Sequence, residues 1–276
     1  MVITCVRGRH EHLRRQRRWL AATSPRPIAH VVVNMGDPAL PGVLAADDPG
    51  CRTLVVDVPG DPMRLSAARN AGVAAAIEAG ADEVVLLDVD CLPTTGLIAE
   101  HCESLVGLGT APSVVCGRVR YLPEGLSEAD HRPEHLWAVT DDHRLRVVPA
   151  GAELVAGDPR MLWSLNIALR VSDWSTIGGF DEGYVGYGAE DTDFGQRLHA
   201  AGGTMWWSGR ATAFHQYHPV SNPPVEHAAS IARNANLFRR RWGFEPMEGW
   251  LRDLADLGML RRAADGDWTV TGSAPA

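Results

Sequence analysis

The first hundred residues alternate short β-rich runs with helical patterns, and no other feature limits the possible folds as strongly. The expected strands are four runs of Val, Ile and Leu, at 2–6, 28–34, 53–58 and 83–90. The helices expected among them cover 12–22 and 64–80, the second closed by a glycine. This alternation predicts an α/β fold with a mostly parallel sheet flanked by helices.

Polar side chains stand at or just after the ends of these strands. They are Arg7, Asn34, Asp57, Asp88 and Asp90. Open parallel sheets bind ligands in the crevice at the carboxyl ends of their strands. The five side chains are therefore expected to face one shared crevice.

The rest of the chain divides into three stretches of different character. Residues 117–160 show no such pattern and are rich in Pro, Gly and mixed charges, which predicts a mobile active-site loop or an insertion, with a short helix around 134–141. Regular structure returns up to about residue 220, including an acid-rich helix at 189–201. Two amphipathic helices then predict a C-terminal helical extension at 221–276.

Two carboxylates in "VVLLDVDCLP", Asp88 and Asp90, are expected on the same side of a strand end, because side chains alternate there with a period of two. Like charges placed side by side repel unless a cation joins them, and hard oxygen ligands favour Mg²⁺ or Mn²⁺. Capping of the following turn by one of the pair is an equally good explanation of an isolated DxD. The histidines of "AFHQYHP", His215 and His218, add possible ligands and favour metal binding.

The segment "GYGAEDTDFGQRL" places Glu190 and Asp191 directly after a glycine-rich turn, with Asp193 two residues later. Such acids can cap a helix, hold a metal or move a proton. Asp193 is expected to stabilise the helix N-terminus. Two arginines lie earlier, near the helix at 64–80. Arg64 is the expected ligand-binding arginine, and Arg69 is expected on a solvated helix face.

Composition excludes several classes of protein. The formal charge of −8 argues against wholesale nucleic-acid binding. All 26 basic residues are Arg, which excludes a P-loop lysine and a Schiff-base lysine. Five cysteines without CxxC spacing, no signal-peptide pattern and no long apolar run predict a cytoplasmic protein. The basic run 14–18 is either a solvated helix face or, less favoured, a peripheral contact with the inner face of a membrane.

In order along the chain, "VITCVRGR", "RLSAARNAG", "VVLLDVD", "GGFDEGYVGYGAEDTDFGQRL" and "HQYHP" resemble the nucleotide-sugar glycosyltransferases of the GT-A fold. The similarity is greatest to family two and to the β-1,4-galactosyltransferase group, and it covers residues 1–220. It implies a GT-A (Rossmann-like) domain with a nucleotide-binding half at 1–116 and an acceptor and catalytic half at 161–220. The implied function is transfer of a sugar from a nucleotide-diphosphate sugar to an acceptor hydroxyl.

The resemblance also implies roles for individual residues. Asp88 would lie near the ribose, Asp90 and His215 would bind Mn²⁺ or Mg²⁺ on the diphosphate, and Arg7 and Arg64 would contact the nucleotide. Trp163, Ser164 and Tyr187 would shape the sugar and acceptor pockets. Asp191 would be the general base, with Glu190 contacting sugar or acceptor. An inverting transfer from a UDP-sugar is the favoured interpretation, although "VNMGDP" offers both Asn34 and Asp37 as the residue that reads the base.

Three other functions are compatible with parts of the pattern. "LLDVDCLPT" imitates the DxDxT of haloacid-dehalogenase-like phosphohydrolases, but Leu92 stands where Thr is needed and the chain has no lysine. A sugar-nucleotide pyrophosphorylase would need a glycine-rich, lysine-containing signature that is absent. A non-catalytic sugar-binding protein would need no base and would tolerate loss of Asp191.

Overall fold

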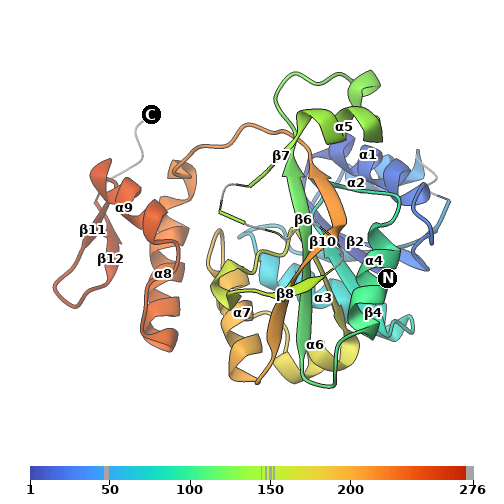
Figure 1. The fold of residues 1–276 in the computed structure, drawn as a ribbon. Helices are drawn as coiled ribbons and strands as arrows, with labels where there is room; N and C mark the ends of the chain where they lie inside the picture. Colours follow the sequence, from blue (N-terminus) through green and yellow to red (C-terminus); the bar gives the residue numbers. More distant parts are fainter. Residues whose placement is uncertain (47–49, 144, 147, 149–150, 152, 272–276) are drawn as a thin grey trace.

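The computed structural model describes residues 1–46, 50–143, 145–146, 148, 151 and 153–271 (Figure 1). The strands of its main sheet are β1 (Val2–Val6), β2 (Ala29–Met35), β3 (Arg52–Val58), β4 (Glu83–Leu87), β5 (Cys91–Pro93), β6 (Ser113–Tyr121), β7 (Asp141–Asp142), β8 (Leu154–Ala156), β9 (Asn166–Arg170) and β10 (Thr204–His215). The helices are α1 (His10–Ala21), α2 (Leu40–Ala45), α3 (Leu65–Glu78), α4 (Leu97–Val106), α5 (Pro133–Val139), α6 (Val171–Ile177), α7 (Glu190–Ala200), α8 (Ala228–Trp242) and α9 (Glu248–Asp256). Three single-turn 3₁₀ helices and a small hairpin complete it: η1 (Glu128–Asp130), η2 (Pro159–Met161), η3 (Val225–His227), β11 (Leu260–Arg262) and β12 (Trp268–Val270).

The main sheet follows the order β3-β2-β1-β4-β9-β6-β10-β5, with β7 beside β6 and β8 beside β10. Strands β3, β2, β1 and β4 are parallel neighbours, as are β6 and β10. Strands β9 and β5 run antiparallel to their neighbours. The predicted α/β fold with a mostly parallel sheet flanked by helices is therefore confirmed.

Helices cover both faces of the sheet because successive side chains of a strand point to opposite sides. Ile3 of β1 packs into the core that contains Val73 of α3 and Phe194 of α7. Its neighbour Val2 packs on the other side, in the core that contains Leu97 of α4. The result is a three-layer arrangement in which the carboxyl ends of β1, β2, β4 and β6 open on one edge (Figure 1).

The fourth strand differs from its prediction at its end. It was expected to reach residue 90, but β4 ends at Leu87, and Asp88 and Asp90 lie in the turn between β4 and β5. The expectation that both aspartates point to the same side of a strand is therefore wrong. The period of two applies only while the chain stays extended.

The stretch 117–160 contains more regular structure than its composition indicates. Its first residues belong to β6, which continues to Tyr121, and the short helix expected around 134–141 is α5. Strands β7 and β8 also lie in this stretch. Residues 144, 147, 149–150 and 152 lie outside the described residues, and the mobility of the loop stays a prediction.

The C-terminal segment, residues 221–271 of the described chain, packs beside α7 (Figure 1). Both expected amphipathic helices are present as α8 and α9. The second ends earlier than expected, because residues 260–262 form β11 of a hairpin that sequence periodicity did not reveal. In the part of the chain that the structure describes, no helix is both long and apolar enough to cross a membrane.

Asp193 attaches this segment to α7. Its side chain is fully buried, and its Oδ1 accepts hydrogen bonds from Arg241 Nη1 at 2.8 Å, Trp242 Nε1 at 2.8 Å and the Tyr184 hydroxyl at 3.1 Å. No side chain caps the N-terminus of α7, so the expected capping role of Asp193 is wrong. Asp193 instead holds α8 against α7.

Replacing Asp193 with Ala is therefore expected to lower the free energy of unfolding by about 2 kcal/mol, because Tyr184 and Trp242 lose a buried acceptor while the partly exposed Arg241 keeps its pair with Asp181. Urea unfolding followed by circular dichroism measures the change. Asp253→Ala, at an exposed position of α9, is the control and is expected to change stability by less than about 0.5 kcal/mol. Equal stabilities of the two variants would contradict the anchoring role.

Candidate active site

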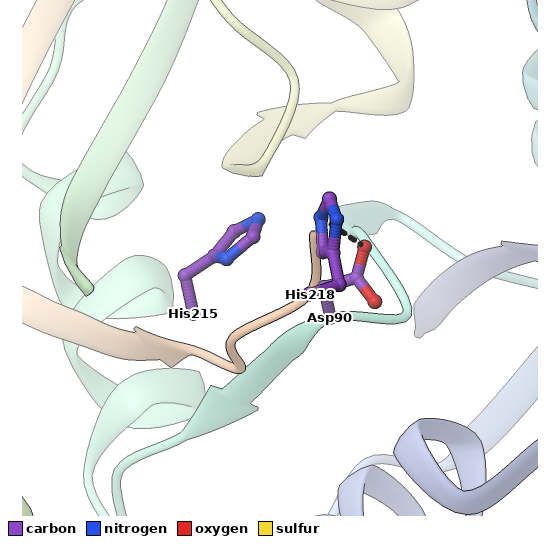
Figure 2. Close-up of side chains that lie close together, drawn as sticks. All are labelled: Asp90, His215 and His218. Carbon is purple, nitrogen blue, oxygen red and sulfur yellow. Dashed lines mark ion pairs between the residues drawn. The ribbon is translucent and has the colours of Figure 1, made fainter. Parts of the chain in front are cut away.

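Three possible metal ligands meet where β4 and β10 end and β5 begins (Figure 2). The pairing of His215 with Cys91 between β10 and β5 brings His215 next to Asp90. One ligand atom from each of Asp90, His215 and His218 lies within 4.8 Å of the others, and His218 Nε2 is 3.5 Å from Asp90 Oδ2. The expected pair of Asp90 and His215 is thus brought together, and His218 joins it.

This donor set fits a divalent cation. Asp90 is buried, and although burial alone would raise its pKa, hydrogen bonds and charges from His12, Arg9 and His215 keep it below the usual value. Burial lowers the pKa of His215 to about 4, so its imidazole is neutral at pH 7, as ligation requires. One carboxylate and two imidazoles suit Mn²⁺ better than Mg²⁺, which prefers oxygen ligands.

Two basic side chains already contact Asp90. Arg9 Nη1 donates to Asp90 Oδ2 at 2.6 Å, and His12 Nδ1 lies 2.6 Å from Oδ1. Arg9 lies directly before α1 and has a left-handed backbone conformation (φ 51°), which few residues other than Gly adopt. Sequence reasoning missed both residues, which hold Asp90 in the arrangement described here.

Arg69 of α3 joins a second group of charges. Its buried guanidinium lies 2.8 Å from Asp191 Oδ1, 3.4 Å from Glu190 Oε1 and 3.6 Å from Asp88 Oδ1. Burial alone would lower the pKa of Arg69, but the charges of Asp191, Asp88 and Glu190 raise it overall. The expectation that Arg69 lies on a solvated helix face is wrong, because it belongs to the buried stripe of α3 with Ala68, Gly72, Val73 and Ala76.

Asp191 is fixed by two further hydrogen bonds. Ser164 donates its hydroxyl to Asp191 Oδ1 at 2.6 Å and its backbone N–H to Oδ2 at 3.1 Å. A carboxylate oxygen can accept more than one hydrogen bond, so Oδ2 retains accepting capacity beside its contact with Ser164. Asp191 is therefore oriented and can still accept a proton.

Two of the clustered carboxyl groups have raised pKa values. Burial and the charge of Asp191 raise the pKa of Glu190 to about 7, against the opposing effect of Arg69. Burial also raises the pKa of Asp88 to about 6, with Asp191 and Asp90 adding to the effect. Several acids with different tendencies to ionise share one site, as proton-transfer chemistry requires.

The predicted nucleotide contacts lie at the ends of β1 and β2 and at the start of α3. Arg7 is exposed and donates to the carbonyl of Gly60, and Arg64 is exposed directly before α3. Asn34 Nδ2 donates to Asp57 at 2.8 Å. Asp37 follows β2 in the chain, and its Oδ2 lies 2.7 Å from both the Gly8 backbone N and His10 Nε2.

The three predicted pocket residues occupy different places. Ser164 contacts Asp191, as described above, and Tyr187 is 37% exposed in the loop before α7. The Trp163 ring lies 5.1 Å from the guanidinium of Arg146, which also lies 4.7 Å from the Trp207 ring. Arg146 is buried, and its guanidinium nitrogens have no hydrogen-bond partner among the described residues. Trp163 therefore packs on a buried cation close to Asp191.

The basic run 14–18 is largely engaged within the protein. Arg15 and Arg18 each contact Glu128 at 2.6 Å, Arg14 pairs with Glu11, and Arg17 is buried. These contacts explain the run without a membrane. A membrane contact through it stays a prediction.

Comparison with known families and proteins gives a consistent result. A family model described as the N-terminal domain of galactosyltransferase matches residues 159–219, which include Ser164, Glu190 and Asp191. Validoxylamine A glucosyltransferase from Streptomyces hygroscopicus subsp. jinggangensis is 34% identical over 79 residues, which are 29% of this chain and 18% of that protein. The match thus spans less than a fifth of the length of this relative.

Solved structures resemble nearly the whole chain at low sequence identity. GalNAc-T7 with UDP, GalNAc and Mn²⁺ matches with a TM-score of 0.59 and 12% identity, over 92% of this chain and 56% of that one. The mannosyltransferase PcManGT from Pyrobaculum calidifontis, in complex with GDP-Man and Mn²⁺, gives 0.58 and 15%, over 93% and 68%. S. aureus TarS residues 1–349 give 0.58 and 13%, over 94% and 70%. The chain therefore has the GT-A fold of glycosyltransferases.

The raised pKa of Glu190 predicts how its replacement alters stability with pH. A carboxyl group whose pKa is higher in the folded than in the unfolded state stabilises the fold in its protonated form. For Glu190, this contribution to the free energy of unfolding is fully present below about pH 4.5 and is lost as the pH rises toward about 7. Relative to the parent, Glu190→Gln is expected to gain about 2 kcal/mol in free energy of unfolding between pH 5 and pH 7.

Urea unfolding of the parent and of Glu190→Gln at the two pH values measures this difference. Groups that titrate in the same way in both proteins do not contribute to it. Glu103→Gln, with a side chain 66% exposed, is the control and is expected to show no pH-dependent difference from the parent. A Glu190→Gln difference that is the same at pH 5 and pH 7 would contradict the raised pKa.

Proposed function

We propose that this protein is a Mn²⁺-dependent glycosyltransferase that moves a sugar from a nucleotide-diphosphate sugar, with UDP-sugar as the favoured donor, to an acceptor hydroxyl with inversion. One observation carries the proposal. A cluster of possible cation ligands (Asp90, His215 and His218) and a carboxylate cluster held by Arg69 lie side by side at the carboxyl ends of the strands of a GT-A sheet. The transfer of a sugar from a diphosphate needs both.

Asp90, His215 and His218 would hold the cation, which supplies positive charge to the departing diphosphate. Arg7 and Arg64, both exposed near this edge of the sheet, would contact the nucleotide. Arg9 would leave Asp90 when the cation arrives, and its charge could then meet a phosphate. The proposed nucleotide-binding half is residues 1–116, with 161–220 as the acceptor half and 117–160 as the loop that closes over the donor.

Asp191 would take the proton from the acceptor hydroxyl through Oδ2 as the acceptor oxygen bonds to the anomeric carbon and the sugar–diphosphate bond breaks. Ser164 and Arg69 orient this carboxylate, so less conformational freedom is lost when it reaches a reactive geometry. Glu190 lies beside it and would bind a hydroxyl of the sugar or acceptor. Because its pKa is about 7, Glu190 is the second candidate for the base.

Release of nucleoside diphosphate tests the function itself. The parent protein is assayed with UDP-glucose, UDP-galactose, UDP-N-acetylglucosamine and GDP-mannose, with Mn²⁺ or with a chelator. The proposal expects diphosphate release from at least one UDP-sugar, and only with the metal. Binding of a donor without release, even with saccharide acceptors present, would favour the non-catalytic sugar-binding function.

Asp90→Ala is expected to remove the Mn²⁺ dependence of UDP binding, because it deletes the only carboxylate of the described metal cluster. Calorimetric titration of UDP with and without Mn²⁺ measures this dependence. The Mn²⁺ dependence, and not the affinity alone, is the informative quantity, because the variant also frees the N–H groups of Arg9 and His12, which can bind phosphate by themselves. His218→Ala is expected to weaken Mn²⁺-dependent binding at least about tenfold.

His199→Ala is the control for the metal-site variants, since His199 is an exposed histidine near the far end of α7. It is expected to bind UDP and Mn²⁺ as the parent does. An Asp90→Ala protein with the parent's Mn²⁺ dependence would remove Asp90 from the metal site.

Asp191→Asn is expected to lower the transfer rate by about two to four orders of magnitude, because it removes basicity while keeping a side chain that can accept from Ser164. Initial rates at saturating donor and acceptor measure the loss, and UDP binding is expected to stay near the parent value. Glu190→Gln is the matched comparison. A larger loss in Glu190→Gln than in Asp191→Asn would make Glu190 the base instead.

A further inference from the structure

The turn between β4 and β5, residues 88–91, contributes one carboxylate to each of the two clusters. Its backbone closes on itself, because the Cys91 N–H donates to the Asp88 carbonyl at 2.8 Å. All four carbonyl oxygens of the turn also accept hydrogen bonds from other elements, and two glutamines supply them. Gln16 lies in α1, and Gln216 directly follows β10.

Gln16 joins the two ends of this turn. Its fully buried side chain donates from Nε2 to the Asp88 carbonyl at 2.7 Å and to the Cys91 carbonyl at 2.9 Å. An amide nitrogen carries two hydrogens, and these contacts use both of them. One side chain of α1 therefore holds the first and the last residue of the turn.

A buried hydrogen-bond network fixes the orientation of the Gln16 amide. Gln16 Oε1 lies 3.1 Å from the Thr4 hydroxyl, which is also 3.0 Å from the Leu87 carbonyl and 3.0 Å from His30 Nε2. Thr4 and His30 are buried, and burial lowers the pKa of His30 to about 3, so its ring is neutral at pH 7. In the opposite orientation, Gln16 Oε1 would face two carbonyl oxygens, which cannot donate. The network thus keeps both N–H groups of Gln16 directed at the turn.

Gln216 holds the middle of the turn. Its backbone N–H donates to the Asp90 carbonyl at 2.7 Å, and its side-chain Nε2 donates to the Val89 carbonyl at 3.4 Å. The same Nε2 donates to the His12 carbonyl at 3.2 Å, and Oε1 accepts from Arg15. Gln216 is itself buried, so it ties the turn to α1 in the interior of the protein.

Closure of the chain does not require these two side chains. The hydrogen bond from Cys91 to Asp88 already closes a β-turn, and water can satisfy the carbonyls of an exposed turn. Glutamine is mostly an exposed residue, because burial of its amide is unfavourable unless its hydrogen bonds are made. Two buried glutamines on four consecutive carbonyls therefore restrict the turn to the conformation described above.

That conformation decides which cluster each carboxylate joins. Asp88 Oδ1 lies 3.6 Å from Arg69, whereas Asp90 lies beside His215 and His218. A turn whose carbonyls were released could adopt other backbone dihedral angles. Asp90 would then spend less time within reach of the two histidines.

We propose that Gln16 is a positioning residue for the cation site and acts through the backbone of the 88–91 turn, with Gln216 supporting the middle of that turn. This inference rests on the proposed function. Gln16 contacts the backbone of the turn and no ligand atom of the cluster. It keeps Asp90 where the two histidines can share one ion with it. Because these ligands are held before the ion arrives, less conformational freedom is lost on binding, and the affinity is higher.

Mn²⁺ binding tests this role without any reaction. The electron paramagnetic resonance signal of free Mn²⁺ gives its dissociation constant, measured on the full chain with and without UDP. Gln16→Met keeps the length of the side chain and removes both donors. It is expected to weaken Mn²⁺ binding about tenfold, as is typical when groups that orient metal ligands are removed.

Gln196→Met is the matched control, because Gln196 is a buried glutamine of α7 whose Nε2 has no hydrogen-bond partner among the described residues. It is expected to bind Mn²⁺ as the parent does. Thr4→Val is a second variant of the network and keeps the test open if Gln16→Met fails to fold. It removes the hydroxyl that orients Gln16 and is expected to weaken Mn²⁺ binding about threefold.

Hydrogen exchange adds a readout of the turn itself. Mass spectrometry of peptides that span 88–91 is expected to show exchange at least about fivefold faster in Gln16→Met than in Gln196→Met, because the turn opens more often. Peptides from α8 are expected to exchange equally in the two variants. Acceleration spread evenly over the chain would indicate a general loss of stability and would overturn the proposal.

Kinetics separate positioning from catalysis. In diphosphate-release assays, Gln16→Met is expected to raise the Mn²⁺ concentration for half-maximal rate about tenfold, and excess Mn²⁺ is expected to restore the rate. Asp90→Ala, which lacks a ligand, is not expected to be restored in this way.

Three results are decisive. Parent-like Mn²⁺ affinity in folded Gln16→Met or Thr4→Val, or unchanged exchange of the turn, would overturn the proposal. A parent that binds Mn²⁺ but releases no diphosphate from any donor would contradict the proposed function, while weaker Mn²⁺ binding by Gln16→Met would still support the role of Gln16. A parent that binds no Mn²⁺, with or without UDP, would overturn the cation site and this inference together.

Discussion

The buried guanidinium of Arg69 is the interaction on which the site depends. It reaches Asp88 after β4 and both Glu190 and Asp191 at the start of α7, so it joins the two halves of the sheet edge. Three carboxylates this close would repel one another strongly without a cation. Because Arg cannot lose its proton in proteins, this positive charge is present at every physiological pH.

The C-terminal segment helps to fix the position of the carboxylates that Arg69 contacts. Asp193, two residues after Asp191, binds Arg241 and Trp242 of the last turn of α8, and the loop before Glu190 fits against Ser230 and Asn234. Movement of α8 would therefore displace both ends of the first turn of α7. The segment predicted as a helical extension therefore helps to position the carboxylates at the start of α7.

Local patterns were sufficient to predict the first four strands and the helices α1 and α3, but not the short helix α2. The pairing of Asp90 with His215 came from the family resemblance. Arg69 was missed although its signal is present, because it shares the helical stripe of Ala68 and Gly72, which a count of apolar residues alone overlooks. The anchoring role of Asp193 could not be predicted, since its partners are 48 and 49 residues away. The position of antiparallel β9 between β4 and β6 likewise depends on long-range strand pairing, which no local sequence pattern predicts.

The early end of β4 has a chemical consequence. In an extended strand, Asp88 and Asp90 would point to the same side and would serve one cation together. In the turn that follows Leu87, Asp88 faces Arg69, whereas Asp90 faces His215 and His218. One tripeptide thus contributes a carboxylate to each cluster, so two peptide units of backbone fix the position of the possible cation ligands relative to the carboxylates around Arg69.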